Sequence, residues 1–279
     1  FGIHGLFDEF KIVGEESILG GSTKPVALAN PKITGEDSSR IALFLLEEYV
    51  LYDDTSLNAG IRWESIDRDY EGTEDRDDST FSASGGVSHD LSETWNISGN
   101  LNYSERAPDT AELYSDGAHH ATESYEVGNP NLDTESAVGI ELIVRKTFGK
   151  VTGQLSAFHT KFDDYIFLKE TGLERDPEGN SPPGAGEEEL PEKAYEAIDA
   201  EFQGIEVEID WLAMENQGWD LLLSFYGDTI TGKNKTEGGN LPRIPASRLG
   251  IGFEVMQEKL DFGINLTRSL KQDSLGDDE

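Results

Sequence analysis

WNISGNLNY, the stretch from Trp95 to Tyr103, alternates strictly between two kinds of side chain. Its odd-numbered positions are apolar or glycine, and its even-numbered positions are Asn or Ser. A period of two is the pattern of a β-strand whose two faces differ in polarity. The stretch therefore predicts a strand with one apolar and one hydrophilic face.

The same alternation recurs along the chain, for example in residues 56–63, 248–255 and 260–266. In each of these stretches an apolar residue (Leu, Ile, Phe, Trp, Val or Ala) alternates with a polar residue or glycine. Taken together, the alternating stretches predict about eleven strands. Their expected ranges are 1–13, 38–52, 55–68, 79–91, 94–106, 136–147, 151–168, 197–213, 218–231, 246–256 and 260–270.

The links between these strands are alternately short and long. Asp53-Asp54 and Ser92-Glu93 are two-residue links, whereas residues 106–135 and 169–197 form very long ones. A meander with tight turns at one end and large loops at the other is typical of an outer-membrane β-barrel. A soluble β-sandwich shows the same alternation with its apolar face in a core, and it remains the alternative.

Two details favour the barrel. The polar faces carry small hydrophilic residues, as expected for a wet or plugged lumen, and aromatic residues stand near strand ends, as in interfacial girdles. These aromatic residues are Trp63, Trp95, Tyr103, Trp211, Trp219 and Phe225.

Composition narrows the function classes. The 279 residues carry a net charge of −34, from 56 acidic and 22 basic residues, which argues against nucleic-acid binding. The longest apolar stretch, Ile41 to Leu46, is strand-sized, so no transmembrane helix is expected. The chain has no cysteine, which excludes disulfides and thiolate metal sites.

The two ends lead us to expect a piece of a longer protein. Residues 1–10 lack the basic start of a signal peptide, and residues 276–279 resemble the middle of a loop. An odd number of strands also does not close a usual bacterial barrel. We therefore expect residues 1–279 to form part of one β-barrel domain, with no second domain.

Residues 106–115, RAPDTAELYS, resemble the Arg-Ala-Pro…Glu-Leu-Tyr segment of TonB-dependent outer-membrane receptors. Four further matches follow in the order of that family, at residues 128–132, 162–166, 204–206 and 241–245. The resemblance implies an all-β fold, namely part of an antiparallel transmembrane β-barrel without its plug domain. It also implies uptake of a scarce nutrient through the cell outer membrane.

The resemblance further implies the partners and the cargo. The partners would be outer-membrane lipid, a small-molecule or metal substrate, and the TonB energy-coupling complex, reached through a plug that this chain lacks. No resident cofactor is expected. The chain is loosely similar to zinc-uptake receptors, so zinc is placed ahead of a ferric siderophore or haem as the transported ligand.

His119 and His120 lie in the longest link, close to Asp116, Glu123 and Glu126. Imidazole and carboxylate groups suit Zn²⁺ or a similar metal, and His or Tyr can also bind haem iron axially. Adjacent histidines in an extended segment point to opposite sides, so ordinary loop polarity is the alternative. The metal-site candidates are therefore His119 and His120, and the substrate-loop candidates are Tyr114, Asp116, Glu123 and Arg106.

An enzyme is not expected. The carboxylate pairs Glu47-Glu48 and Asp163-Asp164 lie on predicted strands, where neighbouring side chains face opposite ways. The chain also lacks the Gly-x-Ser-x-Gly motif of a nucleophile elbow. The rival class is therefore a soluble all-β ligand-binding or adhesion-type protein.

Overall fold

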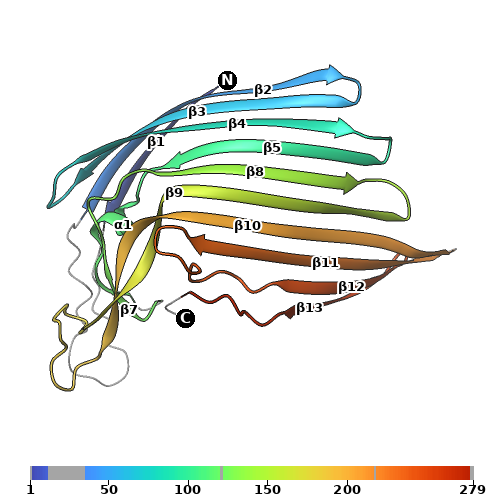
Figure 1. Cartoon of the computed structure of the whole chain (residues 1–279). Coiled ribbons are helices and arrows are strands. Elements are labelled where there is room, and N and C mark those ends of the chain that lie inside the picture. Colours follow the sequence, from blue (N-terminus) through green and yellow to red (C-terminus); the bar gives the residue numbers. More distant parts are fainter. Residues whose placement is uncertain (1, 12–34, 120–121, 217, 277–279) are drawn as a thin grey trace.

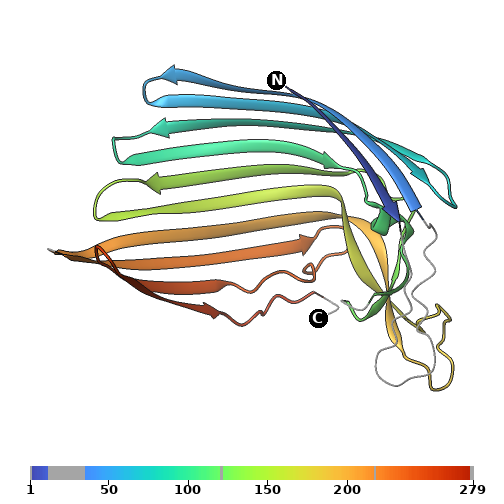
Figure 2. The ribbon, with the colours of Figure 1, turned by 180° about the vertical axis from the view of Figure 1, so that it is seen from behind.

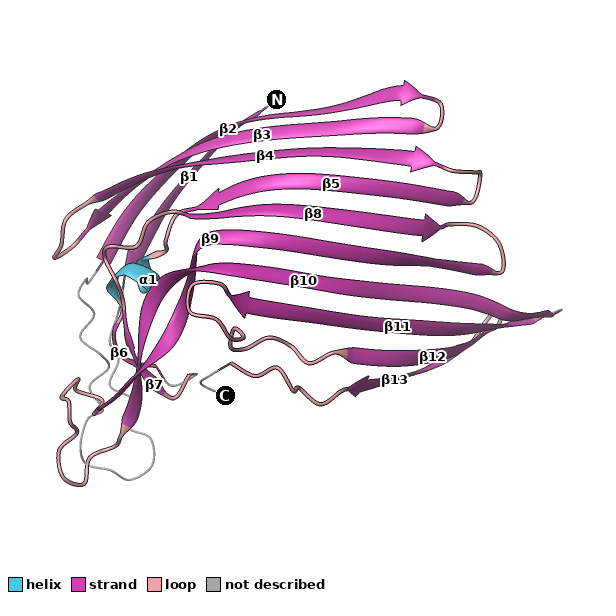
Figure 3. Ribbon diagram, viewed as in Figure 1, coloured by secondary structure: helices cyan, strands magenta, loops and turns pink. Residues whose placement is uncertain are grey.

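The computed structural model describes residues 2–11, 35–119, 122–216 and 218–276. In this part of the chain nearly all regular structure is β-strand, and the five residues Thr110–Tyr114 form the helix α1 (Figure 3). The strands join into one strongly curved sheet, seen from its two sides in Figures 1 and 2. No helix in the described residues is long and apolar enough to cross a membrane.

The sheet follows chain order, apart from an insertion between β5 and β8. Its strands are β1 (Gly2–Lys11), β2 (Gly35–Tyr52), β3 (Thr55–Tyr70), β4 (Arg76–Asp90), β5 (Trp95–Arg106), β8 (Glu135–Lys146), β9 (Val151–Arg175), β10 (Leu190–Asn216), β11 (Trp219–Asn234), β12 (Arg248–Met256) and β13 (Asp261–Ser269). Each pairs antiparallel with the next, and β1 and β13 are the two edges of the described sheet. The eleven expected strands are thus confirmed.

The alternation of short and long links is also confirmed. Residues 53–54, 91–94, 147–150 and 257–260 form tight connections at one end of the sheet (Figure 1, right). The longer connections gather at the opposite end, where β9 and β10 bend away from the sheet (Figure 1, left).

The expected 29-residue link over 169–197 is wrong. β9 continues to Arg175 and β10 begins at Leu190, with Leu190 paired to Arg175 and Lys193 to Glu170. The true link is residues 176–189. The extension was missed because its residues, KETGLER at 169–175 and LPEKAYE at 190–196, do not alternate between apolar and polar.

The link 106–135 contains structure that the sequence pattern did not predict. Besides α1, it holds the short strands β6 (Asp116–His119) and β7 (Ser124–Val127), which pair antiparallel with each other. β7 also pairs in parallel with residues 192–194 of β10. The insertion is therefore attached to the β9–β10 extension.

One face of the sheet is an exposed apolar surface. Side chains on this face align from strand to strand, for example Leu57 with Val87 and Ile251 with Leu266. The seven residues that should lie on a lipid-facing band are 37–56% exposed, and they are Leu57, Ile61, Leu101, Ile251, Phe253, Phe262 and Ile264. A soluble sandwich would bury such side chains between two sheets, so the soluble alternative is wrong.

The position of this band gives the tilt of the strands. Directly paired residues on neighbouring strands form a row across the sheet, and one such row runs from Trp95 on β5 to Leu266 on β13. Trp95 lies at the tight-turn end of the apolar band on β5, whereas Leu266 lies at the loop end of the band on β13. On β5 the loop end of the band is at Tyr103, eight residues beyond Trp95, which is about 27 Å along the strand. The loop-end boundary therefore shifts by this length over the six strand spacings from β5 to β13, which span about 29 Å. A level band then requires strands tilted by about 40°, the value of transmembrane barrels.

Candidate functional site

Residues 106–115 form a compact unit, the α1 knuckle, at the loop end of β5. Asp109 caps α1, because its side chain accepts a hydrogen bond from the Glu112 amide at 2.9 Å. The Glu112 carboxylate accepts one in return from the Asp109 amide at 2.8 Å. This reciprocal capping box holds a five-residue helix that could not form alone.

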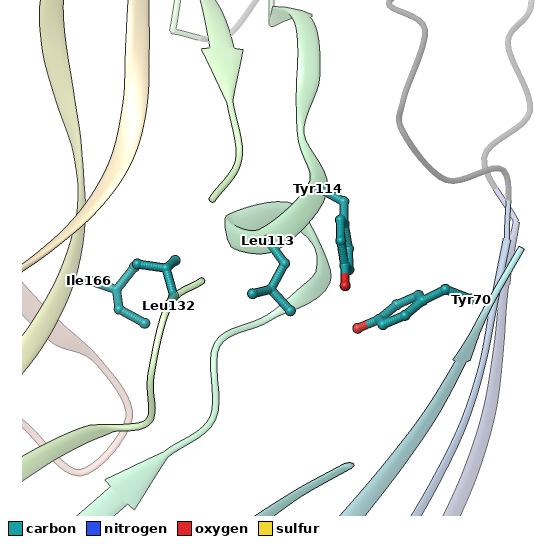
Figure 4. Close-up of a cluster of buried hydrophobic side chains, with 5 residues drawn as sticks. All are labelled: Tyr70, Leu113, Tyr114, Leu132 and Ile166. Carbon is teal, nitrogen blue, oxygen red and sulfur yellow. The ribbon is translucent and has the colours of Figure 1, made fainter. Parts of the chain in front are cut away.

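The α1 knuckle packs onto the polar, inner face of the sheet. Leu113 is fully buried and Tyr114 is 8% exposed. Both belong to a buried cluster that also contains Tyr70 on β3, Ile166 on β9 and Leu132 in the segment before β8 (Figure 4). The rings of Tyr70 and Tyr114 meet edge to face with 4.8 Å between their centroids. Tyr114, a predicted substrate-loop residue, therefore has its side chain in this core.

Arg106 links the α1 knuckle to two strands. Its guanidinium lies 2.8 Å from the Glu112 carboxylate and 3.2 Å from that of Glu135 on β8. Glu135 also accepts a hydrogen bond from the Ile166 amide at 2.9 Å. The Arg106 side chain, predicted to meet substrate, is thus engaged by the protein itself.

Gly128 begins the segment 128–132, the second stretch that resembles the family, and the structure explains why this position is a glycine. A Cβ atom at this position would lie 2.5 Å from the Tyr114 amide nitrogen, which leaves no room for a side chain. Its own amide donates to the Ser115 carbonyl at 2.7 Å, and the next amide donates to the Glu112 carbonyl at 2.8 Å. The segment closes the C-terminal end of α1.

The β6–β7 hairpin carries the other predicted residues. Asp116 accepts a hydrogen bond from the Tyr125 hydroxyl at 3.0 Å, and the Arg175 guanidinium lies 5.1 Å from the centre of the Tyr125 ring. Burial and the Asp116 carboxylate raise the pKa of Tyr125 to about 12. Glu123 is exposed in the turn, with φ of 48°.

His119 meets a buried carboxylate at the end of the same hairpin. Its Nδ1 lies 3.0 Å from Glu126 Oε1 and 3.0 Å from Thr122 Oγ1. The Glu126 side chain is 9% exposed, and the imidazole is 56% exposed. Tyr195 of β10 donates a hydrogen bond to the other Glu126 oxygen at 3.4 Å.

These groups line a pocket of about 540 Å³ between the hairpin, the β9–β10 extension and residues 241–245. Its floor and walls are mainly aromatic and aliphatic, and the His119 imidazole, Glu126 and Arg243 are the lining groups that can carry a charge near neutral pH. The lining side chains include Tyr165, Phe167, Tyr195, Phe202, Leu241, Pro242 and Ile244. Of the predicted site residues, the pocket brings in His119; Arg106, Tyr114, Asp116 and Glu123 are not among its lining.

His120 lies outside the described residues. Within them, one group of three acidic side chains could hold a metal, and it consists of Asp176, Glu178 and Glu187 in the link between β9 and β10. His119 is not part of that group. The sequence pattern missed Tyr195 because its segment was interpreted as a loop.

Several solved structures have a similar fold. The copper transporter OprC aligns with a TM-score of 0.70 at 17% identity, over 87% of this chain and 36% of its own. The Serratia marcescens hemophore receptor HasR, solved with HasA and heme, aligns with a TM-score of 0.63 at 16% identity, over 85% of this chain and 44% of its own. The siderophore receptor PirA from Acinetobacter baumannii aligns with a TM-score of 0.61 at 17% identity, over 95% of this chain and 38% of its own.

This chain thus spans well under half the length of these three proteins. At such identities the likeness shows the fold alone. The family described as "TonB dependent receptor-like, beta-barrel" matches residues 13–278, nearly the whole sequence. Its members are receptors and transporters of the outer membrane, in keeping with the tilted apolar band. The chain therefore belongs to the β-barrel family of TonB-dependent receptors.

Proposed function

We propose that this chain forms the substrate-receiving part of an outer-membrane receptor that takes up a scarce metal as a chelate. Family membership supports energy-coupled uptake of a nutrient. Uptake would be driven by the TonB complex, acting through a plug domain in the barrel lumen. The similar structures are named as a copper transporter, a hemophore receptor solved with heme, and a siderophore receptor.

The observation that carries the proposal is the paired imidazole in the pocket. Glu126 and Thr122 both engage Nδ1 of His119, and no hydrogen bond of Nε2 to another described residue is found. A histidine that donates Nδ1–H to a carboxylate presents a basic, well-oriented Nε2 to a metal. Such a carboxylate–histidine pair beside an apolar wall suits a ligand with both a metal and a hydrophobic body.

The number of protein ligands favours a chelate over bare zinc. A zinc ion takes three or four ligands from the protein, whereas haem iron can be held by one axial histidine. Among the described residues, His119 stands apart from any group of three potential ligands. The chelate therefore now ranks ahead of the zinc ion that the sequence resemblance suggested.

The size and the lining of the pocket point the same way. A volume of about 540 Å³ lies within the range of small-molecule sites, roughly 300–1,000 Å³. Its aromatic wall, with Tyr165 and Phe202 in edge-to-face contact at 5.3 Å, suits a planar or ring-bearing ligand. The net charge of −34, by contrast, favours a cation over an anionic chelate, so the preference for a chelate rests on the pocket.

The test is a binding comparison on the full-length receptor that contains this chain. Haem, a ferric catecholate and Zn²⁺ are titrated separately by calorimetry into the wild type, His119→Ala and His159→Ala. His159 is the matched control, because it lies on β9 on the outer, lipid-facing side of the sheet. We expect one of the iron chelates to bind and to lose at least about tenfold in affinity in His119→Ala alone.

Two results would contradict the proposal. If Zn²⁺ binds, is lost in His119→Ala, and neither chelate binds, the bare ion is the cargo. If no probe responds to His119→Ala, the pocket is not the metal-recognition site.

A further inference from the structure

The pocket that contains His119 also has an arginine in its lining. Arg243 lies on the wall formed by residues 241–245, whereas His119 belongs to the β6–β7 hairpin, which forms another wall. Among the described residues that line the pocket, Arg243 is the sole arginine or lysine. The walls come from the hairpin, β9, β10, β11 and the link to β12, and so from elements between the two edges of the sheet. A histidine and an arginine thus line one cavity.

The backbone of Arg243 has a conformation that an arginine rarely adopts. Its φ is 60°, in the left-handed region where a side chain costs energy and glycine is favoured. Strain of this kind persists where the surrounding structure imposes it, and it concentrates at functional sites.

The neighbours of Arg243 hold the backbone in this conformation. Leu241 is 2% exposed, and its amide donates a hydrogen bond to the Gly232 carbonyl at 3.0 Å. The Ile244 side chain packs against the cluster that contains Leu241, and it lies over Gly232, where a Cβ atom would come within 2.7 Å of it. A glycine at position 243 would fit the same backbone without strain, so the arginine points to a role for its side chain.

The carboxylate of the pocket is satisfied by its own neighbours. Glu126 accepts hydrogen bonds from Thr122 Oγ1 at 2.7 Å and from the Tyr195 hydroxyl at 3.4 Å. In a chain with a net charge of −34, an anionic ligand is repelled unless a local cation binds it. The planar fork of an arginine matches the oxygens of a carboxylate, which makes Arg243 suited to that task.

We infer that Arg243 binds a carboxylate of the cargo, which is then a metal chelate whose ring system carries carboxylates. This inference rests on the proposed function of the pocket and adds a second point of recognition to it. His119 takes the metal, and Arg243 takes the acid group from another wall. Polar groups placed in this way fix the orientation of a ligand and select it over a neutral chelate of the same shape.

The test uses a probe without a metal, so that the acid group is measured by itself. Protoporphyrin IX, a ring system with carboxylates, and its dimethyl ester are titrated into the full-length receptor, with the fluorescence of the probe as the readout. We expect the wild type to bind the acid at least about tenfold more tightly than the ester, the effect of hydrogen bonds to a charged group. Arg243→Gln should abolish this preference, and His119→Ala should keep it.

Two further variants separate this role from general charge and from folding. Arg145→Gln removes an arginine from the polar face of β8 at the tight-turn end of the sheet, and should leave the preference unchanged. Arg243→Gly relieves the left-handed backbone, so it should melt at or above the temperature of Arg243→Gln while also losing the preference.

The inference fails if the wild type binds neither probe, or binds the acid and the ester equally. It also fails if Arg243→Gln keeps the preference, or if Arg145→Gln lowers it by the same factor. A lower melting temperature for Arg243→Gly than for Arg243→Gln would remove the strain that singles out this arginine. The proposed function has its own criterion, the loss of chelate affinity in His119→Ala, so the two can fail separately.

Discussion

The α1 knuckle and the His119 pocket are neighbours in the long insertion, yet they are built in opposite ways. In the α1 knuckle each ionic group has a partner, and Leu113 is fully buried. In the pocket one imidazole edge is held by Glu126, while the ring is 56% exposed beside an apolar wall. The motif that reveals the family therefore serves as scaffold, and the proposed substrate contact falls to the less distinctive residues around it.

The largest expected loss of stability follows from removing a buried side chain of the α1 knuckle. Leu113→Ala should destabilise the insertion by about 2–5 kcal/mol, because it empties a fully buried site. Hydrogen exchange at the amides of residues 106–135 measures the change. Leu173→Ala is the control, since Leu173 is 52% exposed and should change stability by less than about 0.5 kcal/mol. Equal exchange in both variants would mean that the cluster does not hold the insertion.

A smaller effect is expected at the carboxylate that joins α1 to β8 and β9. Glu135→Ala removes the acceptor of the Ile166 amide and a partner of Arg106, and should cost about 1.5–3 kcal/mol. Glu135→Gln retains an oxygen for the amide, so we expect a loss of about half that size. Chemical denaturation followed by the same exchange experiment ranks the two. A Gln variant as unstable as the Ala variant would assign the effect to charge instead of to the hydrogen bond.

The smallest effect concerns the hairpin that links the two regions. The folded hairpin keeps the Tyr125 phenol proton up to a pKa of about 12, whereas the unfolded chain loses it near pH 10. Its stabilising contribution is complete below pH 10 and is lost as pH rises through 12. Hairpin stability should therefore fall over this window, and fall less steeply in Tyr125→Phe. Parallel pH profiles for the two proteins would remove Tyr125 as the cause.

Strand alternation was sufficient to predict the eleven main strands and the outward side chains. A tilted strand in a bilayer has one lipid face, so Leu101 and Asn102 differ at the level of sequence. The β9–β10 extension could not be predicted in this way. Tyr195 lies there against the buried cluster that contains Leu113, in a segment whose polarity does not alternate.

The pocket was only partly predictable. His119 and Glu126 are close in sequence, and the hairpin register brings them together. Arg243 and Tyr195 come from segments far along the chain, and only the folded β9–β10 extension and the link after β11 place them at the same pocket. Predicted residues such as Arg106 and Tyr114 were chosen for their chemical groups, which carry no information on whether the fold has already engaged them.

The most direct measurement is a paired comparison of Tyr70→Ala and His119→Ala in the full-length receptor. Both stability and affinity for the bound chelate are measured for each variant. Tyr70→Ala removes the aromatic contact with Tyr114, so we expect lower stability and unchanged affinity per folded molecule. His119→Ala should leave stability unchanged and weaken the chelate by at least about tenfold. The opposite pattern, with affinity lost in Tyr70→Ala and retained in His119→Ala, would contradict the division between scaffold and substrate site.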